Sequence, residues 1–165
     1  MKYKFCPHCG KPTTLKEIGD EGLIPYCEPC GAALWDSFKT AIICAVVNEE
    51  GQVALLRQDY VSTTNYVCVA GIIKLGEDAE ETVVREVKEE LGLDVTDFKY
   101  LRSYFYEKGE LLMLGYVVNV KKADFSLSCE VDSAEWFELS EAQSKLRAGG
   151  VACQLVCQVA KDIIK

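Results

Sequence analysis

The stretch "GIIKLGEDAEETVVREVKEELGL", residues 71–93, carries three glutamates close together near its end, Glu86, Glu89 and Glu90. Like charges at this spacing repel each other and cost stability. Because the second and third follow the first by three and four positions, a helix would place the carboxylates on neighbouring parts of its surface. The question raised by this stretch is what offsets the repulsion.

The same stretch has the start and stop signals of a helix. Asp78 can cap the first turn, with Glu81 as its capping-box partner, and Gly92 suits the position just past the end. At about 100° per residue, Glu90 lies nearest the apolar stripe of the helix and Glu89 lies furthest from it. We predict that the stripe consists of Val83, Val84, Val87 and Leu91. The glutamates are then expected at the edge of the packed face.

Carboxylates placed in this way are typical of a divalent-cation site. Their oxygens converge, Mg²⁺ and Mn²⁺ prefer oxygen ligands, and a bound cation removes the repulsion. Arg85, four residues before Glu89, can bridge to neighbouring carboxylates and fix their rotamers. The charge pattern by itself is equally compatible with a solvated acidic helix face.

A family motif favours the cation site. The stretch resembles the Nudix box, GX5EX7REUXEEXGU with U a bulky aliphatic residue, and it matches at every specified position from Gly71 to Leu93. The resemblance implies an α/β fold, an α/β/α sandwich with a mixed sheet. It also implies an enzyme that hydrolyses a diphosphate linkage in a nucleoside diphosphate bonded to another group, using Mg²⁺ or Mn²⁺ and an activated water.

Residue roles follow from the resemblance by position. It implies that Glu86 and Glu90 bind the catalytic metal, with the backbone carbonyl of Ala70 beside them. Glu89 is implied to be a further metal ligand or the general base. The resemblance further implies that Arg85 and Glu77 hold the helix and the preceding loop in place.

The first part of the chain has the spacing of a structural zinc site. "CPHCG" and "CEPCG" contribute Cys6, Cys9, Cys27 and Cys30, and four thiolates close a tetrahedral site with no open position. A segment this short buries little core, so the metal would supply the folding free energy. Iron in the same site, a redox pair and disulfides are the alternatives, and His8 is expected to be an exposed bystander. We predict a zinc ribbon over residues 1–38 and a Nudix hydrolase domain over residues 39–165.

A ribbon directly followed by a Nudix domain resembles the bacterial NADH pyrophosphatase branch of the family. That resemblance implies that Glu130, six residues before Trp136, reaches the metal or the substrate, and that the backbone of Ala152 contacts the substrate. The branch motif SQPWPFPxS is absent, because an ungapped reading gives "SYFYEKGELLM" from Ser103 to Met113. The substrate is therefore left open among ADP-ribose, NAD(H) and related dinucleotides. The aromatic residues of this stretch, Tyr104, Phe105 and Tyr106, are expected either to stack on a base or to lie in the core.

Apolar runs rich in β-branched residues indicate the strands of the second domain. A helix is expected from Val151 onward, where apolar residues recur at helical spacing. Two hairpins are predicted, one formed by residues 40–47 and 53–57, the other by residues 98–106 and 111–120. The remaining predicted strands are Tyr66–Gly71 and Ala134–Phe137.

Composition narrows the classes of partner. The net charge of −8 argues against general nucleic-acid affinity, which needs a basic surface, and against an RNA-end hydrolase. No apolar run is long enough to cross a bilayer, and the N-terminus lacks the pattern of a signal peptide, so we expect a cytoplasmic protein without membrane partners.

A nucleotide-sensing module without turnover is the main functional alternative. A homodimer is expected by analogy with ribbon-bearing relatives.

Overall fold

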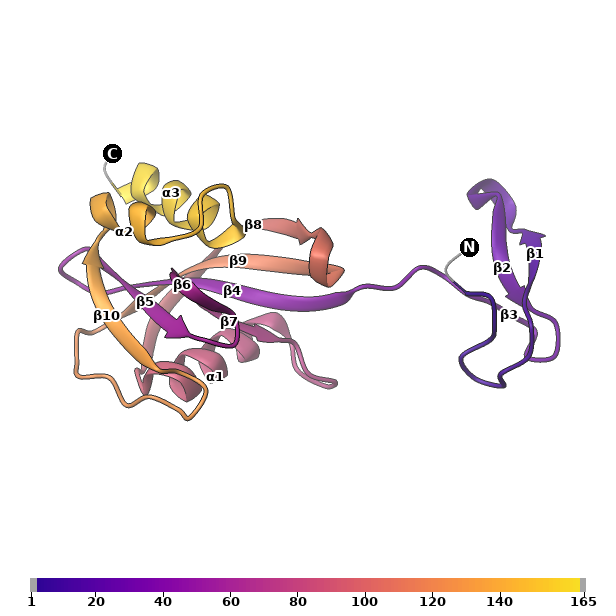
Figure 1. Cartoon of the computed structure of the whole chain (residues 1–165), viewed down its shortest axis with the longest axis horizontal. Coiled ribbons are helices and arrows are strands. Elements are labelled where there is room, and N and C mark those ends of the chain that lie inside the picture. The colour runs from indigo at the N-terminus through magenta and orange to yellow at the C-terminus, as the bar shows by residue number, and fades with distance from the viewer. Residues whose placement is uncertain (1–2, 164–165) are drawn as a thin grey trace. The chain divides into compact units, whose positions relative to one another are not determined.

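The computed structural model describes residues 3–163. Residues 1–2 of the predicted zinc ribbon and residues 164–165 of the predicted Nudix domain lie outside the described residues. The chain divides into two compact units, Met1–Phe38 and Lys39–Lys165, each shown in Figure 1. No helix in the described part of the chain is both long and apolar enough to span a bilayer.

The first unit is a small antiparallel sheet with strand order β1-β2-β3. Its elements are β1 (Thr14–Glu17), η1 (Gly19–Glu21), β2 (Leu23–Cys27) and β3 (Ala32–Ala33). Its buried residues are few, with Cys6, Cys27 and Leu34 packed together. A core of this size stabilises a fold only weakly, which is why a further cross-link is expected here.

The second unit is built on a mixed sheet with the central order β10-β5-β4-β9-β8, to which β6 and β7 add by pairing with β5 and β4. The strands are β4 (Lys39–Val47), β5 (Gln52–Gln58), β6 (Ser62–Val67), β7 (Val69–Ile72), β8 (Val95–Tyr106), β9 (Leu111–Val120) and β10 (Ser133–Glu138). The pair β4–β9 is parallel and the other pairs are antiparallel. The central β4 is buried almost along its whole length because helices cover both faces of the sheet.

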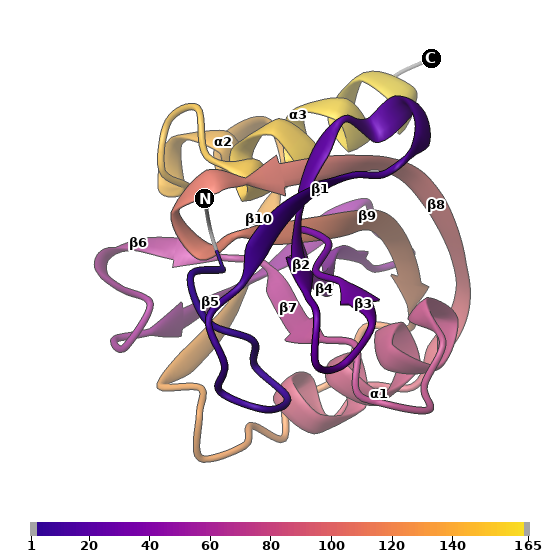
Figure 2. The ribbon, with the colours of Figure 1, turned by 90° about the vertical axis from the view of Figure 1, so that its right-hand side faces the viewer.

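Helices form the two outer layers, as Figures 1 and 2 show. On one face, Val83, Val87 and Leu91 of α1 (Ala79–Leu91) pack against alternate side chains of β4, including Ile42 and Cys44. On the other face, α2 (Leu139–Lys145) and α3 (Val151–Ile163) pack on the opposite side chains of the same strand. The predicted α/β/α sandwich with a mixed sheet is confirmed.

Both predicted hairpins are confirmed, but one strand was predicted wrongly. Tyr66–Gly71 is not a single strand, because β6 ends at Val67 and β7 begins at Val69. The break at Cys68 lets the chain pass from pairing with β5 to pairing with β4. Sequence reasoning also missed α2, whose seven residues are too few for a helical repeat to be recognised.

Helix α1 has both predicted ends. The amide of Glu81 donates to the Asp78 carboxylate at 2.8 Å, and the Glu81 carboxylate accepts from the Asp78 amide at 3.2 Å. Gly92 adopts a left-handed conformation at the C-terminus with φ 73°. The predicted stripe was wrong at Val84, which is 44% exposed, whereas Thr82 is buried against the preceding loop.

Candidate active site and structural metal centre

Arg85 is the centre of the charge network on α1. Its Nε and Nη2 donate to the two carboxylate oxygens of Glu77 at 2.7 and 2.8 Å. Its Nη1 donates to Glu86 at 2.6 Å and to Glu89 at 3.1 Å, and Nη2 also donates to the carbonyl of Ile72 at 3.3 Å. One guanidinium therefore ties the helix to the loop before it and offsets part of the repulsion between the glutamates.

The ion pair between Arg85 and Glu77 fixes the charge of both groups. Hydrogen bonds from Arg85 lower the pKa of Glu77 to about 2, with the amide of Lys74 and the hydroxyl of Thr82 acting in the same direction. The carboxylate of Glu77 in turn raises the pKa of the Arg85 guanidinium. With the pKa of Glu77 at about 2, this pair is ionised at neutral pH, as a positioning role requires.

Glu90 is the most deeply buried carboxylate of the site, with 4% of the residue exposed. Its Oε1 accepts a hydrogen bond from Nε2 of Gln58 at 2.8 Å, whereas its Oε2 is buried and has no hydrogen-bond partner in the described part of the chain. Burial raises the pKa of Glu90 to about 7, against the opposing effects of the Gln58 side-chain amide and, more weakly, the Ala70 backbone amide. A buried, unpaired carboxylate oxygen is costly, and a cation would satisfy it.

Glu86 lies against the backbone of β7. A Cβ placed on Gly71 would lie 1.9 Å from Glu86 Oε1, so the box glycine leaves the space that this carboxylate fills. Burial raises the pKa of Glu86, and the hydrogen bond from Arg85 opposes the shift. The Glu86 carboxylate held against β7 and the unpaired oxygen of Glu90 are the two groups that would suit a cation between α1 and the strand that carries Ala70.

The expected convergence of the three glutamates is incomplete. In residues 3–163, oxygens of Glu86, Glu89 and Glu90 do not form a group in which all lie within 4.8 Å of one another. Arg85 accounts for this, because it holds Glu86 and Glu89 while Glu90 turns toward Gln58. Glu89 is the most exposed of the three, with half of its side chain accessible.

Glu130 faces the same region from the loop between β9 and β10. It lines a hollow of about 470 Å³ together with Tyr60 and three neighbours, Asp59, Cys129 and Asp132. Its negative charge contributes to the raised pKa values of both Glu90 and Tyr60, after the larger effect of burial. The structure therefore brings Glu130 within electrostatic range of Glu90.

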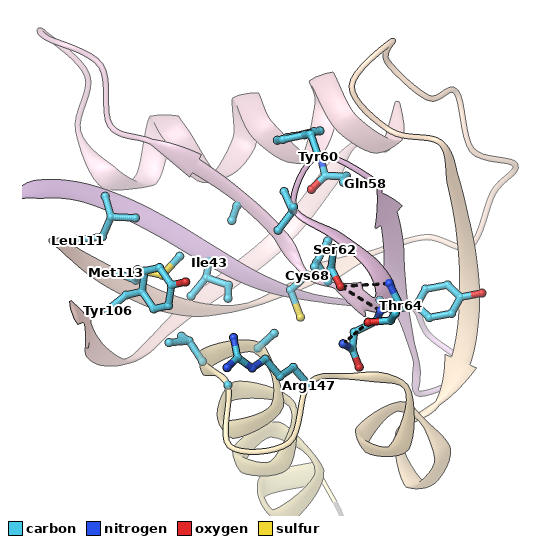
Figure 3. A pocket seen from close by; sticks show the side chains of 18 residues that line it. Ile43, Gln58, Tyr60, Ser62, Thr64, Cys68, Tyr106, Leu111, Met113 and Arg147 are labelled. Atoms are coloured by element: carbon cyan, nitrogen blue, oxygen red, sulfur yellow. Dashed lines mark hydrogen bonds between the residues drawn. The ribbon is translucent and has the colours of Figure 1, made fainter. Parts of the chain in front are cut away.

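A cavity of about 560 Å³ adjoins this acidic region (Figure 3). Ala70 and Ala152 both line it, and so does Gln58, whose amide reaches Glu90. The hairpin of β8 and β9 forms one wall through its three lining residues, Tyr106, Leu111 and Met113. Of the three consecutive aromatic residues that end β8, Tyr104 is core and Phe105 is 57% exposed, so Tyr106 alone lines the cavity.

Sequence reasoning missed Gln58, Tyr60 and Arg147, which also line the cavity. Gln58 gave no clear signal, because it follows Arg57 at the polar end of β5, and only the structure shows that it is buried. Tyr60 and Arg147 lie in loops, where hydrophobic periodicity gives no information.

The four predicted cysteines come together in the first unit. Their sulfur atoms all lie within 4.8 Å of one another, with Cys6 and Cys30 4.0 Å apart and Cys9 and Cys27 3.5 Å apart. Backbone amides of Cys9 and His8 lower the pKa of Cys6 to about 6, although burial opposes them. His8 is exposed and is not a member of the group, as expected. Four sulfurs at this spacing suit a tetrahedral ion such as Zn²⁺.

The family model of the NUDIX domain matches residues 37–153. The chain belongs to the Nudix family. Its box, α1 and the cavity beside it all lie inside the matched Nudix region, and the four cysteines precede that region.

Curated relatives with similar sequences include two proteins named NAD-capped RNA hydrolase NudC. The protein from Vibrio atlanticus (strain LGP32) is 29% identical over 98% of this chain and 59% of its own length. The protein from Pseudomonas putida (strain W619) is 29% identical over 85% of this chain and 50% of its own length. The chain thus spans about half of the length of these relatives.

Solved structures show the same Nudix fold. A NUDIX hydrolase from Nitrosomonas europaea aligns with a TM-score of 0.71 and 18% identity, covering 96% of this chain and 91% of that one. The NUDIX domain of Shewanella oneidensis NrtR, complexed with ADP ribose, aligns with a TM-score of 0.67 and 13% identity, covering 85% of this chain and 94% of that one.

The burial of Glu90 predicts an unusual pH dependence of stability. Between about pH 4.5 and pH 7 the folded protein keeps a proton on Glu90 that the unfolded chain has released. Without a cation in the acidic site, stability should therefore fall as the pH rises through this window, by roughly 3 kcal/mol in total, and the contribution should level off above it. Urea unfolding at pH 5.0 and pH 7.5 without added divalent cation, followed through Trp136, measures the difference.

Glu90→Gln is the control, because the amide keeps the shape of the side chain but cannot ionise. The variant should lack this part of the pH dependence. If the free energy of unfolding changed equally between pH 5.0 and pH 7.5 in the wild type and the variant, Glu90 would already be ionised at pH 5.

Proposed function

We propose that this chain is a metal-dependent Nudix diphosphohydrolase. Its substrate is a nucleoside diphosphate bonded to another group, and its products are a nucleoside monophosphate and a second phosphorylated compound. The observation that carries the proposal is the unpaired, buried oxygen of Glu90, whose carboxylate is joined through Gln58 to a cavity large enough for a nucleoside. A pure binding module has no need of a carboxylate kept in this unfavourable state.

Four groups would hold the catalytic Mg²⁺ or Mn²⁺, namely Glu86, Glu90, the carbonyl of Ala70 and Glu130. When bound, the cation neutralises phosphate charge and lowers the pKa of an attacking water. Glu130 lies on a loop outside α1, so it can serve the cation, the substrate or both.

Glu89 is the proposed general base. It is the most exposed of Glu86, Glu89 and Glu90, and one of its oxygens binds Arg85 at 3.1 Å, which leaves the other to accept a proton. Water adds to one phosphorus atom, Glu89 takes the proton, and the bond from that phosphorus to the bridging oxygen breaks. Arg85 and Glu77 are positioning residues, and the backbone of Ala152 contacts the nucleoside in the cavity.

The names of the similar proteins suggest where to look for the substrate. NAD-capped RNA is the substrate in the names of the two curated relatives, and ADP ribose is bound to one structural neighbour. We therefore propose a substrate related to NAD, either free or at an RNA end. A homodimer and a cytoplasmic location stay predictions.

A turnover screen tests the proposal. NADH, NAD⁺, ADP-ribose, FAD, diadenosine polyphosphates, nucleoside triphosphates and a short NAD-capped RNA would each be incubated with the protein and Mg²⁺ or Mn²⁺. We expect one or a few of these compounds to yield a nucleoside monophosphate. Tight binding of one compound with no turnover of any would instead support the nucleotide-sensing module.

A further inference from the structure

Most polar side chains that line the 560 Å³ cavity already have partners. Gln58 donates to Glu90, and the hydroxyl of Tyr66 donates to Glu135. On β6, Ser62, Thr64 and Asn65 bind one another, as the dashed lines in Figure 3 show. These bonds tie the groups of the wall to one another, and none of the three β6 side chains carries a charge.

Arg147 is different. It is the single charged residue among the described residues that line the cavity. Although the chain has 26 acidic residues, the guanidinium of Arg147 makes no hydrogen bond or ion pair within residues 3–163. All of its five N–H donors are therefore available at a cavity wall that is otherwise uncharged.

The position of Arg147 in the cavity is equally informative. Figure 3 shows Gln58 and Tyr60 at one end and Arg147 reaching in from the opposite end. Because Gln58 binds Glu90, the first end is the one at which the scissile diphosphate is proposed to lie. Arg147 also lines a second hollow of about 280 Å³ together with Tyr106, so these two residues flank the same rim.

We propose that Arg147, with the hydroxyl of Tyr106, binds a second phosphate group of the substrate that is not part of the scissile diphosphate. This inference rests on the proposed function, which places the diphosphate at the Glu90 end. The nucleoside then spans the cavity and brings its ribose substituents toward Arg147. A guanidinium offers a planar fork that matches the oxygens of a phosphate, and a neighbouring hydroxyl completes the contact. The favoured substrate class is a dinucleotide-type compound whose ribose carries a phosphate ester.

Pairs of substrates that differ by one phosphate test the inference. NADPH and NADH differ at the ribose 2′ position, whereas coenzyme A and dephospho-coenzyme A differ at the 3′ position, so the two pairs distinguish the sources of the phosphate. For at least one pair, kcat/KM should be about tenfold higher for the phosphorylated member, and Arg147→Gln should abolish that preference. Arg147→Lys should restore part of it, because the charge is kept and the fork is lost.

Lys145→Gln is the matched control. It removes one positive charge two residues before Arg147, at the end of α2, but Lys145 lines neither the 560 Å³ cavity nor the 280 Å³ hollow. The control should keep the preference. Equal kcat/KM values within both pairs, or an equal loss for both members in the Arg147→Gln protein, would overturn the inference.

A binding measurement separates this inference from the proposed function. Titration calorimetry with adenosine 2′,5′-bisphosphate, adenosine 3′,5′-bisphosphate and AMP needs no turnover. One bisphosphate should bind about tenfold more tightly than AMP, and Arg147→Gln and Tyr106→Phe should reduce the difference. Arg147-dependent binding without hydrolysis of any compound would refute the hydrolase and keep the subsite. Hydrolysis without any preference for the additional phosphate would keep the hydrolase and refute the subsite.

Discussion

Replacing Glu86 with glutamine is expected to lower kcat for diphosphate hydrolysis about a thousandfold, because the variant loses a charged ligand of the proposed cation. The amide preserves the shape that fills the space beside Gly71, where a Cβ would lie 1.9 Å from Oε1. It also removes one of three neighbouring negative charges, which offsets the weakened hydrogen bond from Arg85. Steady-state kinetics with Mg²⁺ and with Mn²⁺ would measure the loss of kcat.

The fold should survive this substitution. The melting temperature of the Glu86→Gln protein without added divalent cation should lie within a few degrees of the wild-type value. Glu141→Gln on α2 is a matched control, since it removes one exposed carboxylate from another helix and should leave kcat unchanged. Retention of wild-type activity by the Glu86→Gln protein would refute the assignment of Glu86 as a metal ligand.

The features that could be predicted from sequence are those set by local chemistry. The capping box of Asp78 and Glu81 and the left-handed Gly92 depend on residues close in the chain, and both ends of α1 were placed correctly. Apolar runs rich in β-branched residues likewise revealed the hairpins. The box itself predicted the bridging role of Arg85, because the residues that it binds lie within thirteen positions along the chain.

The features that could not be predicted depend on residues distant in sequence. Gln58 lies 32 positions from Glu90, and no local pattern indicates that its amide reaches that carboxylate. The exposed Val84 fits the helical period, but neither sheet nor loop covers its position on α1. Arg147 and Tyr106 share a cavity wall only because the β8–β9 hairpin and the loop before α3 meet beside β6. Tertiary geometry of this kind is invisible to periodicity.

Removing zinc from the cysteine site is expected to unfold residues 3–38 while residues 39–163 stay folded. The core of the first unit consists of little more than Cys6, Cys27 and Leu34, whereas the second unit has two large clusters of its own. A structural Zn²⁺ contributes about 10–16 kcal/mol to small domains, far more than such a core can supply. Without an ion, four sulfurs that lie within 4.8 Å of one another would have nothing to join them.

The two tryptophans allow each unit to be followed separately, since Trp35 lies in the first and Trp136 packs on Phe125 in the second. After treatment with a chelator, the emission of Trp35 should shift in the Trp136→Phe protein, while that of Trp136 should stay constant in the Trp35→Phe protein. Cys27→Ser should lower the zinc content and reproduce the change in Trp35 emission. Cys129→Ser is its control, because this exposed cysteine lies outside the cluster and its loss should leave the zinc content unchanged. If the chelated protein kept the same Trp35 emission and the same melting curve, the prediction would be refuted. The four cysteines would then hold no ion on which the fold of the first unit depends.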